Sequence, residues 1–131
     1  LRARLGPDST WDVCSAGVMA SYGSLASREG VKVMREDGID ATNHMSRPLT
    51  SDLVDAASLL VVMTAAHAEQ VRSAFPAGAE KALLLKSFDP DSEGVDIDDP
   101  IGMPVAAYRR TRDEIEAALP GLVEFMQSLE E

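Results

Sequence analysis

The chain has 131 residues, of which 45% are hydrophobic and 26% are charged; it is long enough for one globular domain with one core, and its composition excludes extensive disorder. The formal charge of −10 excludes nucleic acid and anionic membranes as partners unless the basic residues form a separate face. The longest apolar run, residues 56–63, is too short to span a bilayer.

The first residues have a helical pattern that ends early. Leu1 and Leu5 stand at i, i+4 spacing, and Gly6 and Pro7 follow in the order that ends helices. No N-capping residue stands ahead of Leu1 in the sequence. We therefore expect residues 1–131 to be a single domain that is N-terminally incomplete and begins inside a helix.

The rest of the chain alternates strand-like and helix-like segments. The predicted strands are Thr10–Ser15, Ser58–Met63 and Ala82–Lys86. The predicted helices are Leu25–Asp37, a short helix up to Ala57 capped by Thr50 or Ser51, Ala65–Ala74, and a long helix that opens at Pro104 and that Pro120 should kink or split. Such alternation is typical of an α/β domain with a mainly parallel sheet. Three strands are few for a sheet covered on both faces, and a fourth strand ahead of Leu1 would complete it.

Cys14 is the only cysteine of the chain. One cysteine cannot form an internal disulfide, which favours a reducing compartment. A thiolate that attacks phosphate needs an anion-binding loop and usually an arginine, commonly in the order cysteine, five residues, arginine. Counted from Cys14, the arginine would fall on Ala20, so the pattern fails. We interpret Cys14 as a buried strand residue.

The stretch from residue 89 to residue 100 is strongly acidic. Asp89, Asp91 and Glu93 occupy the first, third and fifth places of a calcium-loop pattern, and Gly94 the sixth. The twelfth place is Pro100, where such a loop requires a bidentate glutamate. A solvated acidic loop is therefore the favoured interpretation over calcium binding.

Asp99 and the two histidines are the candidates for proton chemistry. Asp99 precedes Pro100, and Ile101 adds apolar bulk beside it, so we expect its carboxyl to be held partly dry and to serve as a general acid. An Asp-Pro turn without function is the plain alternative. His44 and His67 lack the spacing of a metal pair, and neither a metal nor another cofactor is predicted.

Several segments together resemble the low-molecular-weight protein tyrosine phosphatase family, in particular its bacterial branch near the protein-arginine phosphatases. The matching segments, in the order of the family, are Cys14-Ser15-Ala16-Gly17-Val18, Gly38-Ile39, Asn43-His44, Pro48-Leu49-Thr50, Leu60-Val61-Val62-Met63-Thr64, Asp99-Pro100-Ile101-Gly102, and Tyr108-Arg109-Arg110-Thr111-Arg112-Asp113-Glu114-Ile115. The resemblance covers nearly the whole chain. It implies a three-layer sandwich around a small, mainly parallel doubly wound sheet, with the first strand and its C-x5-R phosphate loop missing here.

The resemblance also implies roles for three residues. Asp99 matches the general acid that protonates the leaving group, and Ser15 and His44 match residues that hold the phosphate loop in shape. The nucleophilic cysteine and the phosphate-clamping arginine of the family match no residue of this chain. Ile101 stands where an aromatic residue often follows Asp-Pro, which weakens the case for a wall that stacks on a phosphotyrosine ring.

We therefore expect the complete protein to be a cytoplasmic protein phosphatase that hydrolyses phosphotyrosine or phosphoarginine through a cysteinyl-phosphate, and the chain as given to be inactive. The expected partner is a phosphorylated protein substrate, with no nucleic acid and no membrane, and the sequence leaves the oligomeric state open. Two alternatives remain at this point. One is a non-catalytic binding domain of the same fold, and the other is an arsenate reductase, which would need further cysteines.

Overall fold

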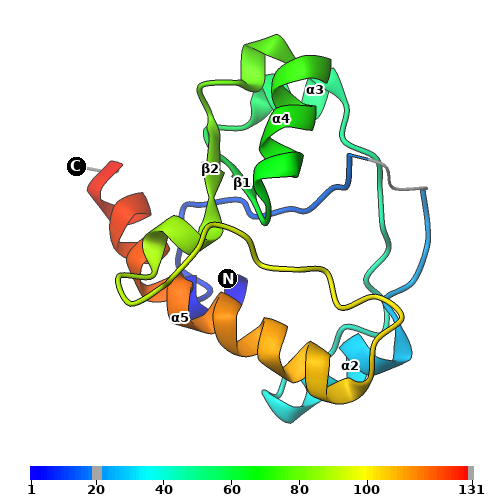
Figure 1. Ribbon diagram of the computed structural model, residues 1–131. Coiled ribbons are helices and arrows are strands. Elements are labelled where there is room, and N and C mark those ends of the chain that lie inside the picture. Colours follow the sequence, from blue (N-terminus) through cyan, green and yellow to red (C-terminus); the bar gives the residue numbers. More distant parts are fainter. Residues whose placement is uncertain (19–21, 130–131) are drawn as a thin grey trace.

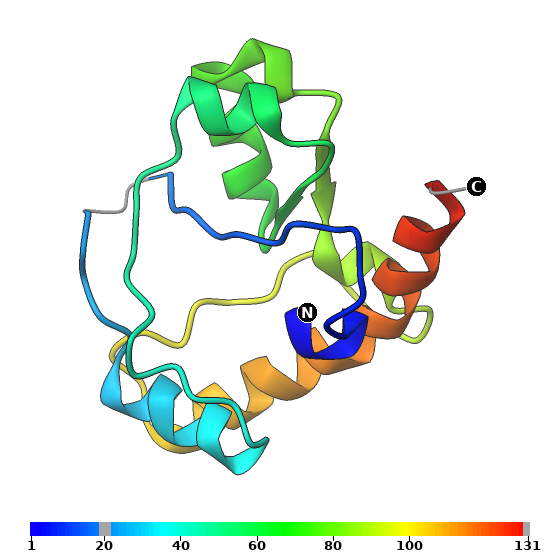
Figure 2. The ribbon, with the colours of Figure 1, turned by 180° about the vertical axis from the view of Figure 1, so that it is seen from behind.

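The computed structural model describes residues 1–18 and 22–129 (Figure 1). Its helices and strands follow in the order α1 (Arg2–Leu5), α2 (Arg28–Glu36), α3 (Ser51–Ala56), β1 (Leu60–Val62), α4 (Ala65–Ala74), the 3₁₀ turn η1 (Pro76–Gly78), β2 (Ala82–Leu84), the 3₁₀ turn η2 (Leu85–Phe88) and α5 (Val105–Leu129). The fold is α/β, as predicted. α4 runs alongside the two strands and contacts both of them, with α3 next to α4, whereas α1, α2 and α5 lie toward the end of β2 that leads into η2 (Figures 1 and 2).

The sheet consists of β1 and β2, which pair in parallel. Leu60 pairs with Ala82, and Val62 pairs with Leu84. The sequence thus predicted these two strands and their direction correctly, although both are shorter than expected. The connection through α4 makes the pair a β-α-β unit, which is the repeating element of doubly wound sheets.

The predicted strand Thr10–Ser15 is wrong, because this segment has no strand assignment. Buried and exposed side chains nevertheless alternate along this segment, since Trp11 and Val13 are half-buried while Asp12 and Cys14 are exposed. A strand also needs a neighbouring strand to bond its backbone, and no strand among the described residues pairs with this segment. The exposure of Cys14 likewise corrects its interpretation as a buried residue.

The helix starts follow from side-chain caps. Ser27 Oγ accepts a hydrogen bond from Gly30 N–H at 3.1 Å, so α2 begins at Arg28 and not at the predicted Leu25. Thr50 Oγ1 caps α3 through Leu53 N–H, as predicted. Thr64 caps α4, and the bounds predicted for this helix are confirmed.

Helix α5 runs unbroken through Pro120, so the expected split does not occur. Its ribbon nevertheless changes direction part-way along (Figure 1), which fits the loss of one backbone hydrogen bond and the steric demand of a proline ring inside a helix. The helix begins at Val105, directly after Pro104. Beside the proline, Gly121 lets α5 approach η2 closely, because a Cβ at this position would lie 2.2 Å from the Phe88 carbonyl oxygen.

The main hydrophobic cluster lies where α5 packs against η2 and the segment after it. Its buried members are Leu85, Ile97, Ala118, Leu119, Leu122 and Met126. Leu1, Leu5, Trp11, Leu59, Val61, Met63, Phe88 and Ile115 pack around this cluster and are only partly buried. The chain exposes 8624 Å², whereas a compact monomer of 14.0 kDa would expose about 6,700 Å². The molecule is therefore more open than a complete domain of its size.

Candidate functional site

Two of the three predicted site residues meet in the structure. Ser15 Oγ and His44 Nε2 share a hydrogen bond of 3.2 Å, although 29 positions separate them in the sequence. Both residues are exposed. The pair joins the extended segment after Trp11 to the loop between α2 and α3, and such a contact restrains the position of both segments.

The loop that carries His44 is ordered by its own turns. Asp40 Oδ1 accepts hydrogen bonds from Thr42 N–H at 2.9 Å and from Thr42 Oγ1 at 2.6 Å. These two bonds lower the pKa of Asp40, and the bond from the Thr42 side chain contributes most to this effect. His44 N–H then donates to the Ala41 carbonyl at 3.2 Å. The Asp40-Ala41-Thr42 turn therefore fixes the backbone position from which the His44 side chain projects.

Arg47 positions Ser15, the other residue of the pair, and Arg47 was not identified from the sequence. Its Nε donates to the Ser15 carbonyl at 3.0 Å, and its own carbonyl accepts from Gly17 N–H at 2.9 Å. Leu49 N–H donates back to the Gly17 carbonyl at 3.0 Å, and Gly17 and Pro48 form a parallel bridge. The only signal in the sequence was the position of Arg47 directly before Pro48 in one of the family segments.

Asp99 lies on a different segment from the Ser15–His44 pair. Its Oδ1 accepts a hydrogen bond from Ile101 N–H at 3.0 Å, which closes a turn around Pro100. Asp99 is exposed, and Ile101 is 73% exposed, so the expected partly dry carboxyl is not found. Among the described residues, Asp99 forms no hydrogen bond with Ser15 or His44. That all three residues line one concavity is a prediction that rests on the family resemblance.

The segment before Asp99 is anchored at the carboxyl end of β1. Ile97 N–H donates to the Met63 carbonyl at 2.8 Å, and Asp96 Oδ1 accepts from Ala65 N–H at 2.8 Å. Asp96 thereby supplies a carboxylate to the first turn of α4, where the helix dipole favours negative charge. This end of the strands is where doubly wound folds place their sites, so Asp99 follows an anchor at the expected edge of the sheet.

Asp99 also lines a cleft of about 390 Å³ against the first turns of α5. The polar lining comes from Asp98, Asp99, Arg110, Thr111 and Glu114, and Met103 adds an apolar wall. Thr111 Oγ1 donates to the Asp98 carbonyl at 3.4 Å and ties the acidic segment to the helix. The cleft can therefore place several carboxyl groups and one guanidinium beside a bound side chain.

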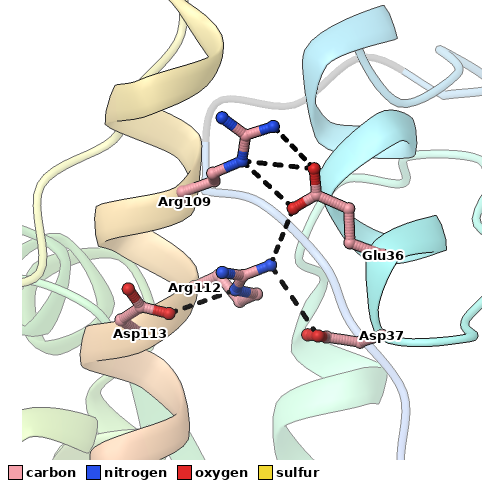
Figure 3. A network of polar contacts seen from close by, with 5 residues as sticks. All are labelled: Glu36, Asp37, Arg109, Arg112 and Asp113. Carbon is pink, nitrogen blue, oxygen red and sulfur yellow. Dashed lines mark hydrogen bonds and ion pairs between the residues drawn. The ribbon is translucent and has the colours of Figure 1, made fainter.

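A network of ion pairs joins α5 to the end of α2 (Figure 3). Arg109 and Arg112 both bind Glu36, at 2.7 Å and 3.0 Å, and Arg112 also reaches Asp37 at 3.7 Å and Asp113 at 3.2 Å. The hydrogen bond from Arg109, assisted by the charges of Arg109 and Arg112, lowers the pKa of Glu36 to about 2. The network fixes the helix that follows the Asp99 segment to the helix that precedes the His44 loop.

Cys14 is the only cysteine of the chain, and it lacks the spacing to an arginine that a phosphate-binding loop needs. Cys14 is a free, exposed thiol, and Ala20, where its arginine partner would have to stand, lies outside the described residues. Within the described ranges, no group of three or more histidine, cysteine, aspartate or glutamate residues is placed to hold a metal ion. A search of the same residues finds no helix that is both long and apolar enough to cross a membrane.

Comparison with known proteins places this architecture in a family. The sequence matches low molecular weight phosphotyrosine protein phosphatase over residues 2–131, and the chain belongs to this family. It is 38% identical over 117 residues to a protein-arginine-phosphatase of Geobacillus stearothermophilus, a match that covers 89% of this chain and 78% of the relative.

Solved structures lead to the same family. The arginine phosphatase YwlE of Geobacillus stearothermophilus has a TM-score of 0.85 at 36% identity. The match covers 98% of this chain and 80% of the YwlE chain. A low molecular weight protein tyrosine phosphatase of T. tengcongensis has a TM-score of 0.81 at 33% identity. This match covers 93% of our chain and 81% of the T. tengcongensis chain. These similarities confirm the predicted family and fold class.

Proposed function

We propose that residues 1–131 are the larger part of a protein phosphatase domain that hydrolyses phosphorylated side chains through a cysteinyl-phosphate, with the nucleophile and the phosphate loop on residues ahead of Leu1. The observation that carries the proposal is the Ser15–His44 hydrogen bond of 3.2 Å, in a chain that belongs to this phosphatase family. Ser15 and His44 would brace the phosphate loop. Residues 1–131 alone lack the nucleophile and would be inactive.

Asp99 is the proposed general acid. Its exposed carboxyl stands on a turn whose geometry is set by the Ile101 N–H bond, next to the cleft formed with α5. In its protonated form it would give a proton to the leaving oxygen or nitrogen as the phosphorus–leaving-group bond breaks. The cysteine thiolate would take the phosphoryl group, and water would then release it as inorganic phosphate.

Phosphoarginine is the substrate that we favour over phosphotyrosine. The similarity to arginine phosphatases of Geobacillus supports this choice. Ile101 supports it as well, since an aliphatic residue beside Asp99 offers no aromatic ring for stacking on a phosphotyrosine. We place the complete protein in the cytoplasm, because its proposed mechanism needs a reduced cysteine and a reducing compartment keeps thiols in that state.

The first test is the reading frame upstream of the codon for Leu1. A short apolar strand followed by a cysteine, five residues and an arginine is the expected result, and the longer protein should hydrolyse phosphoarginine faster than phosphotyrosine. A frame without such a motif would instead favour a non-catalytic binding domain of the same fold. Loss of arsenate reduction on mutation of further upstream cysteines would point to an arsenate reductase.

The second test is Asp99→Asn in the longer protein. Loss of the general acid should lower kcat by about 10²–10⁴ for a substrate with a poor leaving group. The loss should be much smaller for p-nitrophenyl phosphate, whose leaving group needs little protonation. Asp98→Asn is the matched control, because Asp98 lines the same cleft and should leave both rates nearly unchanged. Equal losses for both substrates would contradict the role of Asp99.

A further inference from the structure

A third residue, Arg47, bonds the chain at two points next to the Ser15–His44 pair. Its Nε donates to the Ser15 carbonyl at 3.0 Å, and its own carbonyl accepts from Gly17 N–H at 2.9 Å. These two bonds fix the two peptide groups between Ser15 and Gly17. Because the allowed side-chain rotamers depend on the backbone angles, fixing the backbone here also restricts the direction of the Ser15 hydroxyl.

Pro48 explains why Arg47 is the residue in this position. A proline has no N–H, and it restricts the residue before it to extended conformations. In the parallel bridge between Gly17 and Pro48, the hydrogen bonds come from the neighbours of the proline, since the Arg47 carbonyl accepts from Gly17 N–H and Leu49 N–H donates to the Gly17 carbonyl at 3.0 Å. The missing N–H of Pro48 is therefore not needed, and the backbone of Arg47 is held extended beside Gly17.

The segment that carries Arg47 is also bonded on its other side. Ser46 N–H donates to the Ser24 carbonyl at 2.7 Å, and the Ser46 carbonyl accepts from Gly23 N–H at 2.8 Å. Arg47 itself is half-buried. A guanidinium that projects from a backbone bonded on both sides loses little freedom when it binds a carbonyl, so the contact with Ser15 is preorganised.

We propose that Arg47 is a positioning residue of the phosphatase site, which acts on the reaction through Ser15 and not by contact with the substrate. It holds Ser15 Oγ at hydrogen-bond distance, 3.2 Å, from His44 Nε2. The inference rests on the proposed function for its effect on catalysis, in which Ser15 and His44 brace the phosphate loop. A displaced pair would displace that loop, and a misplacement of about 1 Å can cost about 100-fold in rate.

The first experiment tests the contact without any enzymatic activity. The 131-residue chain has two histidines, so proton NMR gives two imidazole Cε1–H signals, which His67→Gln assigns. We expect Arg47→Ala to shift the His44 signal and to leave the His67 signal in place. Ser15→Ala should shift the His44 signal as well. The double variant should match Ser15→Ala alone, because Arg47 acts through Ser15.

The second experiment measures turnover by the longer protein. Arg47→Ala should lower kcat by about 10-fold to 100-fold, and by the same factor for phosphoarginine and for p-nitrophenyl phosphate, because the phosphate loop serves both substrates. Millimolar guanidinium ion should restore part of the rate, since it can donate to the Ser15 carbonyl. Arg47→Lys should keep more activity than Arg47→Ala for the same reason.

The rescue separates positioning from a general loss of stability, because a denaturing ion does not restore a protein that is merely less stable. Arg4→Ala is the matched control. Arg4 is exposed on α1 and forms no ion pair with another described residue. This variant should have an unchanged rate and no response to guanidinium beyond that of the unsubstituted protein.

Three results would overturn the inference. They are an unchanged His44 signal in Arg47→Ala, a double variant whose shift is the sum of the two single shifts, and a loss of rate that guanidinium does not reverse. A longer protein without phosphatase activity would contradict the proposed function. The NMR signals would still decide whether Arg47 positions Ser15 against His44, because they do not depend on catalysis.

Discussion

At the level of single residues, Glu36 is a carboxylate whose pKa is strongly lowered by its neighbours. Its pKa lies near 2 because Arg109 and Arg112 bind its charged form. A carboxyl whose pKa is lower in the folded state adds stability above its unfolded pKa of about 4.3, and this contribution is lost as the pH falls toward 2. The contact between α2 and α5 should therefore weaken in this acidic window.

Glu36→Gln tests this account. We expect a lower melting temperature than the unsubstituted chain at pH 6, and a difference that shrinks between pH 4.5 and pH 2 or in 0.5 M NaCl, because the pair is exposed to solvent screening. Thermal melts followed by circular dichroism provide the measurement. Glu124→Gln is the control, since Glu124 is exposed on α5 and forms no ion pair with another described residue. Parallel pH profiles for the Glu36 variant and the unsubstituted chain would contradict the assignment.

The sequence singled out two residues that the structure brings into contact, Ser15 and His44, but it did not predict the environment of Asp99. The order of family segments identified Ser15 and His44, and the structure brings them into contact. The sequence also predicted that the Asp99 carboxyl is partly shielded from water. This was wrong, because the Ile101 side chain points into solvent and does not cover the carboxyl. Arg47 was not predicted as part of the site, because its role depends on a contact with a residue 32 positions away in the sequence.

At the scale of elements, the packing of α5 on η2 depends on Gly121. Gly121→Ala should gain about 1 kcal/mol of helix propensity but should still destabilise the fold by about 1–3 kcal/mol, because the new Cβ would overlap the Phe88 carbonyl. Urea unfolding measures the net change. Ala117→Gly, at an exposed position of the same helix, should lose about 1 kcal/mol and calibrates the propensity effect. A more stable Gly121→Ala variant would show that α5 does not approach η2 this closely.

Elements with local signals were predicted well, and elements that need distant partners were not. The bounds of α4 follow from its Thr64 cap and from Phe75 and Pro76 at its end. The strands β1 and β2 have continuous apolar runs that identify buried parallel strands without further information. Residues 10–15 have a strand-like alternation, but a strand exists only when another strand bonds it, and no alternation pattern can supply that partner.

At the scale of the whole molecule, the exposed area predicts low cooperativity. A chain that exposes 8624 Å² when folded buries less on folding than a compact domain of equal length, so its urea m-value should be smaller and its transition broader. The partly buried apolar side chains around β1 should bind the dye ANS before any urea is added. A steep transition without ANS binding would indicate that the free chain closes its open surface.

Residues 1–131 belong to the phosphatase family, and we propose that they do not contain its nucleophile. The most direct measurement is the hydrolysis of p-nitrophenyl phosphate by the purified 131-residue chain, side by side with Cys14→Ser. We predict no release of p-nitrophenol above background in either protein, because the position six residues after Cys14 is an alanine and not a phosphate-binding arginine. Hydrolysis by the unsubstituted chain that Cys14→Ser abolishes would contradict the account and would make Cys14 the nucleophile.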